Sequence, residues 1–212
     1  VQGGLLRSGG EIRSAEGLAL DAAVEFAVAK ALDQVIAGLA IDWSKCYDRL
    51  PLEVLEVVAR EAGVPGCISG PMLAAYGHGR RILSRGLAGE VGEPTCGLTP
   101  GCPGATDWLA LVTAPWILRA RRVHGEAQAR AYVDDLTAWC RGLGCVGAVG
   151  GLVELVDGFG KAAGLKITEG KSRRFGLPES TARELAMEGG PPVADAFRDL
   201  GVVQVIGDER HK

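Results

Sequence analysis

Two adjacent carboxylates, Asp134 and Asp135, interrupt an otherwise apolar run that favours a β-strand, residues 130–139. Like charges side by side at the end of a buried strand raise each other's pKa unless a cation or a donor compensates them. The pair therefore predicts a divalent-metal site. The alternative is a polar turn between two strands, because Asp tolerates the conformations of a tight hairpin. A further carboxylate of the right kind elsewhere in the chain would decide between the two interpretations.

Such a carboxylate is Asp42, which directly follows a short apolar run, residues 35–41, that suits a buried strand. A carboxylate at the end of a buried strand, next to a loop, is a common place for a ligand-binding group. The alternative is that Asp42 caps the turn that follows it. A third candidate segment is the loop rich in Pro, Gly and Cys at residues 93–106. Backbone N–H groups of a glycine-rich loop before a helix can approach a phosphate or base closely, although an ordinary long connection is the alternative.

The helices and strands that must position these residues are predicted from the periodicity of apolar residues and from the Gly and Pro residues that end an element. Residues 1–17 are expected to form a loop. We expect helices at residues 18–32, 51–62, 68–76, 107–122, 146–163 and 178–187. Strands are expected at residues 35–41, 80–85, 165–168 and 171–175, in a hairpin around Asp134 and Asp135, and in a strand or hairpin at 197–206.

The composition restricts the class of protein. A chain of 212 residues that is 47% hydrophobic and 23% charged is neither disordered nor membrane-embedded, and it can bury a full core. The net charge of −3 gives no overall attraction to nucleic acid, so such binding must come from local patches. The chain begins at Val1 without a signal-peptide pattern, and its six cysteines form no C-x-x-C pair. We therefore expect a fragment of an intracellular protein with reduced thiols and no zinc cluster.

A competing motif is the formal G-x-G-x-x-G of Gly142 to Gly147, which lies between an expected strand and an expected helix, with Glu169 further on. It would predict a dinucleotide-binding site. The carboxylates in the preceding hairpin and the leading Arg141 argue against that interpretation.

Five segments in order resemble the palm of reverse transcriptases, particularly those of non-long-terminal-repeat retrotransposons and group II introns. The segment Asp42-Trp43-Ser44-Lys45-Cys46-Tyr47-Asp48 is similar to the family's Asp-x-Ser-Lys-Ala-Phe-Asp, and Tyr132-Val133-Asp134-Asp135 to its Tyr-x-Asp-Asp. The loop Gly97-Leu98-Thr99-Pro100-Gly101-Cys102-Pro103 resembles Gly-Leu-x-Gln-Gly-x-Pro. Gly164 to Ser172 resembles Gly-Leu-x-x-Asn-x-x-Lys-Thr, and Phe197 to Val202 resembles Lys-Tyr-Leu-Gly-Val.

The resemblance implies an α+β fold, the palm of a polymerase right hand, with a three- or four-stranded antiparallel sheet and helices packed on one face. Residues 1–34 would be a remnant of the fingers and their connection to the palm, residues 35–188 the palm, and residues 189–212 a strand or hairpin leading toward a thumb. The implied activity is RNA-directed DNA synthesis by a retroelement. Its partners would be an RNA template, a DNA or RNA primer and deoxynucleoside triphosphates.

The resemblance also assigns roles to individual residues. Asp42, Asp134 and Asp135 would be catalytic and would hold two Mg²⁺ ions, which Mn²⁺ can replace, and Lys171 would serve the departing pyrophosphate. Tyr47 would pack under the sugar and exclude a 2′-hydroxyl. The substrate loop would contribute Gly97, Leu98, Pro100 and Gly101. Looser candidates for contacts to the nucleic-acid backbone are Arg80, Arg81, Arg85, Arg173 and Arg174.

Several departures from the family pattern leave alternatives open. Pro100 stands where the family has Gln, which removes a side-chain donor and acceptor and one backbone N–H. Thr168 stands where Asn is usual, and Asp199 where an aromatic residue is usual. One alternative is a catalytically inactive retroelement remnant that only binds nucleic acid. Another is a related palm enzyme such as a viral RNA-dependent polymerase.

Overall fold

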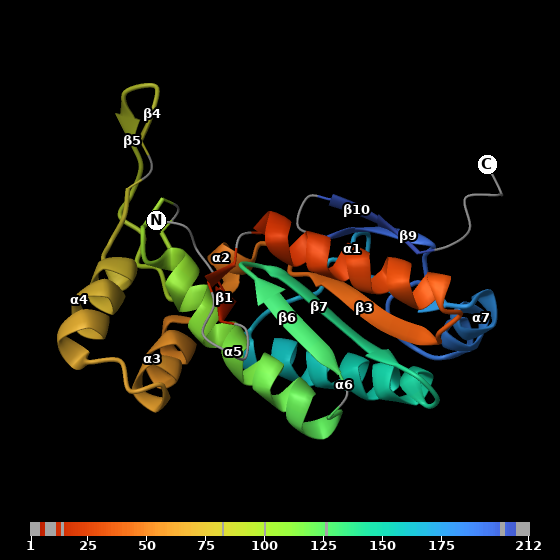
Figure 1. The fold of residues 1–212 in the computed structure, drawn as a ribbon. Coiled ribbons are helices and arrows are strands. Elements are labelled where there is room, and N and C mark those ends of the chain that lie inside the picture. The colour runs from red at the N-terminus through yellow and green to blue at the C-terminus, as the bar shows by residue number, and fades with distance from the viewer. Residues whose placement is uncertain are drawn as a thin grey trace.

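A four-stranded antiparallel sheet with the strand order β6-β7-β3-β8 lies at the centre of the fold (Figure 1). The computed structural model describes residues 5–6, 12–13, 15–81, 83–99, 101–125, 127–199 and 202–206. The strands of the sheet are β3 (Ile36–Asp42), β6 (Gln128–Tyr132), β7 (Asp135–Arg141) and β8 (Arg173–Leu177). Every adjacent pair in this sheet is antiparallel, so it lacks the neighbouring parallel strands on which a dinucleotide site is built.

The apolar sequence of β3 lets it occupy the middle of the sheet, where both faces are covered. Alternate side chains point to opposite faces, so Ala37, Leu39 and Ile41 enter one core cluster, and Ile36 and Ala40 enter the other.

Gly38 lies between these residues in β3 and pairs with Phe175 on β8. The Phe175 ring occupies the space beside Gly38 that a side chain would need. A Cβ at Gly38 would lie 2.4 Å from Phe175 Cζ, so no larger residue fits without displacing that ring.

Three helices cover one face of the sheet, as the sequence predicts. The helix α5 packs against β6, α6 against β3 and β7, and α7 against β8. Together with the sheet they bury the larger core cluster, to which α5 contributes Trp108, Val112 and Trp116. Their bounds are α5 (Ala105–Val123), α6 (Cys145–Ala163) and α7 (Glu179–Met187). The α+β class and the antiparallel sheet are therefore confirmed.

The opposite face is covered by a layer that the expectation of helices on one face does not include. It consists of α1 (Ala15–Ala31) and the hairpin of β9 (Ala196–Asp199) and β10 (Val202–Val205), which lie above the sheet in Figure 1. Phe26 of α1 makes edge contacts with Trp139 and Phe175, and Phe197 stacks on Phe175 with ring centroids 4.6 Å apart. These aromatic contacts form a second core.

The segment between β3 and α5 extends away from the sheet, and its hairpin projects furthest in Figure 1. It contains α2 (Cys46–Arg49), α3 (Leu52–Glu61), α4 (Gly66–Gly77), β4 (Leu83–Ser84) and β5 (Leu87–Ala88). Near the N-terminus, β1 (Leu5–Leu6) pairs with β2 (Ile12–Arg13). The expectation of a loop at residues 1–17 was wrong for the described residues in that range, which include these strands and the start of α1. In the part of the chain that the structure describes, none of the helices combines the length and apolarity needed to span a bilayer.

Two predicted strands are shorter than expected. Among the described residues of the strand expected at 80–85, only Leu83–Ser84 belong to a strand. The strand expected at residues 165–168 is absent apart from a single bridge between Ile167 and Trp43. The reason is a tight turn, in which the N–H groups of Lys171 and Ser172 both donate to the carbonyl of Thr168 at 3.1 and 2.9 Å. This turn also delays the next strand, which begins at Arg173 rather than at Lys171.

Arg174 is a structural residue, and its predicted contact with a nucleic-acid backbone was wrong. Only 3% of the residue is exposed, and its guanidinium donates to the carbonyls of Leu185, Glu188 and Pro191. Burial lowers the pKa of this guanidinium. The side chain ties the end of α7 and the following loop to β8.

Replacing Arg174 with Met is expected to lower the free energy of unfolding by about 3 kcal/mol, because buried carbonyls lose their charged donor. Urea unfolding followed by circular dichroism measures the change. The matched control is Arg183→Met on α7, whose side chain is 73% exposed and pairs with Glu179. That change is expected to cost less than about 0.5 kcal/mol. Equal losses in the two variants would contradict a structural role for Arg174.

Candidate functional site

The β6–β7 hairpin turns within two residues, Val133 and Asp134, because Tyr132 pairs directly with Asp135. Val133 has φ 56°, a left-handed conformation that a β-branched residue rarely adopts. Asp134 therefore lies at the tip of the hairpin, and Asp135 is the first residue of β7. The polar turn and the candidate site are thus the same feature, and the two interpretations of the Asp pair do not exclude each other.

Asp42 is the last residue of β3 and lies opposite Asp135 in the β3–β7 register. It is also close enough to Asp134 for its charge to act on that carboxylate. The pKa of Asp134 is raised, chiefly by burial and further by the charge of Asp42, whereas Lys171 lowers it. The ends of two neighbouring strands therefore bring these carboxylates together, which supports the prediction that Asp42 is the partner of the hairpin.

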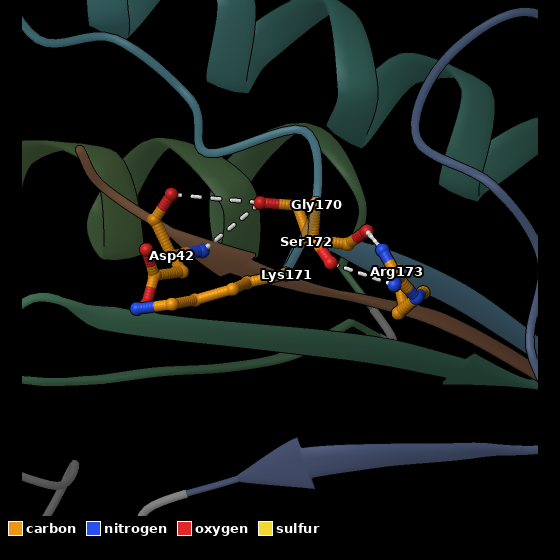
Figure 2. Close-up of polar contacts among 5 residues, drawn as sticks. All are labelled: Asp42, Gly170, Lys171, Ser172 and Arg173. Carbon is orange, nitrogen blue, oxygen red and sulfur yellow. Dashed lines mark hydrogen bonds and ion pairs between the residues drawn. The ribbon is translucent and has the colours of Figure 1, made fainter.

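Lys171 forms an ion pair with Asp42, with 3.2 Å between Nζ and Oδ2 (Figure 2). The Lys171 side chain is 70% exposed and that of Asp42 is 23% exposed. A mobile ammonium thus compensates a partly buried carboxylate, as a bound cation would. The pair places Lys171 at the same site as the carboxylates, in agreement with its place in the matched motif.

A turn formed by residues 168–172 carries Lys171 to Asp42. The carbonyl of Asp42 accepts from the N–H of Thr168 at 2.8 Å, and the N–H of Asp42 donates to Ser172 Oγ at 3.1 Å. Arg173 stabilises the turn, because its guanidinium donates to the carbonyls of residues 169, 170 and 172. Figure 2 shows Ser172 between the backbone of Asp42 and Arg173. Ser172 was not among the predicted site residues, although it ends a matched motif.

Tyr47 lies on the short helix α2, which starts after Lys45 turns the chain with φ 50°. Its half-buried ring packs against the larger core cluster. The pKa of Tyr47 is raised, mainly by burial and next by the charge of Asp134. Tyr47 is therefore a neighbour of Asp134, and its contact with a sugar stays a prediction.

The first part of the predicted substrate loop runs along α2. Leu98 is buried and its N–H donates to the carbonyl of Tyr47 at 2.7 Å, and the N–H of Gly97 donates to the carbonyl of Leu50 at 2.8 Å. Gly97 has φ 97°, and a Cβ there would lie 3.2 Å from the carbonyl oxygen of Asp48. This tight association fixes the loop beside Tyr47.

The second part of the predicted substrate loop contains Pro100 and Gly101. Gly101 is exposed and has φ 81°. Pro100 lies outside the described residues. The contact of Gly97, Leu98, Pro100 and Gly101 with a substrate stays a prediction.

An open cavity of about 530 Å³ adjoins the carboxylates. It lies on the face of the sheet that carries the β9–β10 hairpin. Its walls are formed by Ala40, Ile41, Asp42, Asp134, Asp135, Leu136, Thr137, Gly170, Lys171, Arg173, Ala196, Phe197 and Arg198. The cavity contains charged groups of both signs, which suits a ligand with both anionic and cationic parts.

Cys46 is a further neighbour that the sequence did not single out. It is 2% exposed, and burial together with the charges of Asp134 and Asp42 raises its pKa to about 12. At neutral pH it is therefore a protonated thiol and a poor metal ligand. Each of the six cysteines of the chain is a free thiol.

The carboxylates of the site fit a hard cation that is also coordinated by substrate. Among the described residues, no group of three or more His, Cys, Asp or Glu side chains is arranged to hold a metal. Mg²⁺, however, is usually bound by one or two carboxylates and takes its other ligands from water and substrate phosphates. Asp42 and Asp134 provide such a pair of carboxylates. The role of Asp135 as a third ligand stays a prediction.

The predicted basic contacts differ in their availability. Arg80 donates to the carbonyl of Tyr76 at 2.6 Å, and Arg173 is occupied by the turn before β8. Arg81 and Arg85 are exposed on the projecting segment, so their predicted contacts with a nucleic-acid backbone remain open.

No family model matches the chain, and no curated protein matches it by sequence. Solved structures do match. Telomerase from Candida tropicalis in complex with a TWJ fragment of telomeric RNA has a TM-score of 0.59 and 9% identity, over 74% of this chain and 29% of that chain. Apo telomerase from Candida tropicalis, truncated from its C-terminal domain, has a TM-score of 0.55 and 13% identity, over 93% and 40% of the two chains.

A third match is telomerase from Candida albicans in complex with a TWJ fragment of telomeric RNA, with a TM-score of 0.54, 10% identity, and coverage of 95% of this chain and 33% of that chain. The chain thus spans well under half of the telomerase chains that it matches. At these identities the likeness concerns the fold. The chain has an α+β fold like that of these telomerase structures.

Proposed function

We propose that the chain is the palm of an RNA-directed DNA polymerase from a retroelement, which adds deoxynucleotides to a primer 3′-hydroxyl on an RNA template. The observation that carries the proposal is the meeting of Asp42, Asp134 and Lys171 at one end of the sheet, within a polymerase-like fold. Two of the matching telomerases are in complex with RNA, which supports a nucleic-acid partner.

Divalent ions would supply the activation of the primer 3′-oxygen and the neutralisation of the triphosphate, as two ions about 4 Å apart do in other nucleotidyl transferases. Asp42 and Asp134 would hold Mg²⁺, or Mn²⁺ in its place, with Asp135 as a more peripheral carboxylate. Asp42 ends a central strand, and Asp134 lies in the two-residue turn that joins β6 and β7, so both carboxylates are attached directly to the sheet.

Lys171 is proposed to serve the leaving pyrophosphate. In the structure its ammonium neutralises Asp42, so it must exchange that carboxylate for phosphate oxygens when a substrate binds. Its exposed, flexible side chain permits this movement, and a phosphate offers a stronger negative partner. Near the reacting atoms it would stabilise negative charge or donate a proton.

Tyr47 and the loop that starts at Gly97 are proposed to enclose the incoming nucleotide. The backbone contact between Leu98 and Tyr47 couples the loop to the ring that would lie under the sugar. The incoming nucleotide would then be contacted from two sides, by the Tyr47 ring and by the loop.

The second candidate is a retroelement remnant that binds nucleic acid without catalysis. Pro100 favours it, because this residue replaces the Gln of the matched motif. The ion pair of Lys171 with Asp42 is compatible with both functions.

Primer extension separates the candidates. The assay uses this chain, and any longer natural polypeptide that contains it, with an RNA template, a DNA primer, deoxynucleotides and either Mg²⁺ or Mn²⁺. We expect extension that requires the divalent ion and the Asp134 carboxylate. Binding of the template–primer without extension, and with equal affinity in the Asp134→Asn variant, would contradict the polymerase and favour the remnant.

A further inference from the structure

We propose that Ser172 is a positioning residue, whose hydroxyl fixes the main chain at Asp42 and thereby the location of the carboxylate that would bind metal. The inference rests on the proposed function, since it assigns a role toward the same site. It concerns a residue that contacts neither substrate nor metal and acts through Asp42.

The contacts of the hydroxyl are directed to the backbone of Asp42. Ser172 is fully buried, its Oγ accepts the N–H of Asp42 at 3.1 Å, and it also approaches the Asp42 carbonyl at 3.5 Å. Figure 2 shows both interactions converging on one oxygen. The Asp42 carbonyl has its main partner in the N–H of Thr168 at 2.8 Å, so the N–H depends more on Ser172.

This dependence follows from a gap in the β-ladder. The β3–β8 register ends where Ala40 pairs with Arg173, and the chain then leaves the strand in the turn of residues 168–172. Continued pairing would offer a backbone carbonyl to the N–H of Asp42. The hydroxyl of Ser172 takes the place of that carbonyl, at the one residue of β3 that carries a charge.

The gap changes how Lys171 reaches Asp42. A continued register from the Ala40–Arg173 pair would already place Lys171 opposite Asp42, whereas from the turn its ammonium lies 3.2 Å from the Asp42 carboxylate. A regular strand would keep the two residues in a fixed cross-strand position and would leave the lysine less freedom.

A second set of contacts keeps Ser172 in place. Arg173 donates to the carbonyl of Ser172 at 2.8 Å and to that of Gly170 at 2.7 Å. The N–H of Ser172 donates to the carbonyl of Thr168 at 2.9 Å. Since its backbone is held on both sides, the hydroxyl is a fixed reference point for Asp42. Such outer partners orient ligands in metal sites, and their loss typically weakens metal affinity or activity by about 10–100-fold.

The test compares variants of Ser172 with a matched loss of a buried hydroxyl elsewhere. Ser172→Ala removes the hydroxyl, Ser172→Cys keeps the volume but accepts hydrogen bonds poorly, and Ser172→Thr retains the hydroxyl. The control is Thr113→Val on α5. Thr113 is also fully buried, and its hydroxyl donates to the carbonyl of Leu109 at 3.0 Å.

Three measurements are made on each variant. Electron paramagnetic resonance titration gives the Kd for Mn²⁺ in the absence of nucleotide, and thermal unfolding without metal gives the Tm. Primer extension as a function of Mg²⁺ and deoxynucleotide concentration then separates kcat from KM.

We expect Ser172→Ala and Ser172→Cys to weaken Mn²⁺ binding by about 10-fold or more and to lower kcat more than they raise the KM for nucleotide. Ser172→Thr should restore Mn²⁺ affinity to within about 3-fold of the unsubstituted protein, since the accepting oxygen returns. Thr113→Val should lower the Tm without changing the Kd for Mn²⁺.

An unchanged Kd for Mn²⁺ in a folded Ser172→Ala or Ser172→Cys variant would overturn the inference, as would an equal change in Thr113→Val. An unsubstituted protein that binds no Mn²⁺ would overturn it too. Binding of Mn²⁺ without primer extension would contradict the proposed polymerase. The Mn²⁺ titration of the variants would then still test the positioning role of Ser172. The failures of the two proposals are therefore distinguishable.

Discussion

Replacing Asp134 with Asn is expected to raise the thermal stability of the protein and to abolish nucleotide addition. The pKa of Asp134 is raised in the folded protein, mainly by burial and further by the charge of Asp42. The folded state therefore binds a proton at Asp134 more tightly than the unfolded state does, and the ionised carboxylate destabilises the fold at neutral pH. Asn removes that charge. The carboxylate is proposed as a metal ligand, so extension should fall by about 1,000-fold or more, or about 4 kcal/mol in the barrier.

The pH dependence gives a second check. As the pH falls through the raised pKa toward the unfolded value, Asp134 takes up a proton and the unsubstituted fold gains stability from this group. The stability difference between Asp134→Asn and the unsubstituted protein should be largest at neutral pH and shrink in acid. The rise in Tm at neutral pH is expected to be small, roughly 2 °C, because the hydrogen bond that Asp134 accepts from its own backbone N–H and the charge of Lys171 already offset part of the effect.

The matched control is Asp157→Asn on α6. The Asp157 side chain is 59% exposed and pairs with Lys161, four residues further along the helix. Its neutralisation should leave extension unchanged and should not raise the Tm. Circular dichroism melts between pH 4 and pH 8 and primer extension with Mg²⁺ provide the data. Retained extension in Asp134→Asn, or a lower Tm at neutral pH, would contradict this view of the site.

The loss of activity, rather than the gain in stability, distinguishes a functional carboxylate from a structural turn. If Asp134 only shaped the hairpin, Asn would be tolerated in the turn and extension would be little changed, whereas the gain in stability from removing the buried charge would remain. The unusual φ of 56° at Val133 also shows that the hairpin tip is not optimised for stability alone. The two readouts of one substitution therefore address both interpretations of the Asp pair.

Local sequence was sufficient to predict the strand ends that carry the carboxylates. The apolar run before Asp42 forms β3, and a hairpin was expected around Asp134 and Asp135. Its turn lies one residue earlier than an Asp-Asp tip would, at Val133 and Asp134, and this turn fixes the register. The helices α5, α6 and α7 were also predictable, because each has a clear apolar side or punctuation at its ends.

Other parts of the site depend on contacts between distant residues. The hydrogen bond from Asp42 to Ser172 joins residues 130 positions apart, and no local pattern distinguishes this serine from an exposed one. The β-favouring residues 165–168 predicted a strand, but the turn at Thr168 prevents continuous pairing with β3. In these cases tertiary structure overrides local propensity.

The layer formed by α1 and the β9–β10 hairpin could not be predicted from the sequence, again because its position depends on contacts between distant residues. The helix α1 was predicted, but its apolar residues occur on all sides, so the pattern does not indicate which face packs. Phe26 is buried against the sheet, whereas Leu20 and Val24 are 64% and 53% exposed. Tertiary contacts, and not the local sequence pattern, therefore determine which face of the sheet α1 covers.

Replacing Tyr47 with Ala is expected to relax sugar selection, so that ribonucleotides are added more readily. The helix α2 places Tyr47 near Asp134, and the backbone bond to Leu98 fixes the adjoining loop. If the ring lies under the sugar, it rejects a 2′-hydroxyl by steric exclusion, and its removal takes away the repulsive element. We expect the ratio of kcat/KM for deoxynucleotide to that for ribonucleotide to fall by roughly 100-fold.

Tyr47→Phe is the matched control, because it keeps the ring and removes only the hydroxyl. It should retain the selectivity of the unsubstituted protein, whereas Tyr47→Ala should lose it. The Ala variant also removes a half-buried ring from the edge of the core, at a cost of roughly 2 kcal/mol, so its assays are run below its measured Tm. Single-nucleotide primer extension with each sugar gives the ratio. If both variants relaxed selection equally, the hydroxyl and not the bulk of the ring would be the discriminating group. If neither changed it, Tyr47 would not contact the sugar, and the similarity of this segment to the Asp-x-Ser-Lys-Ala-Phe-Asp motif would not extend to its aromatic position.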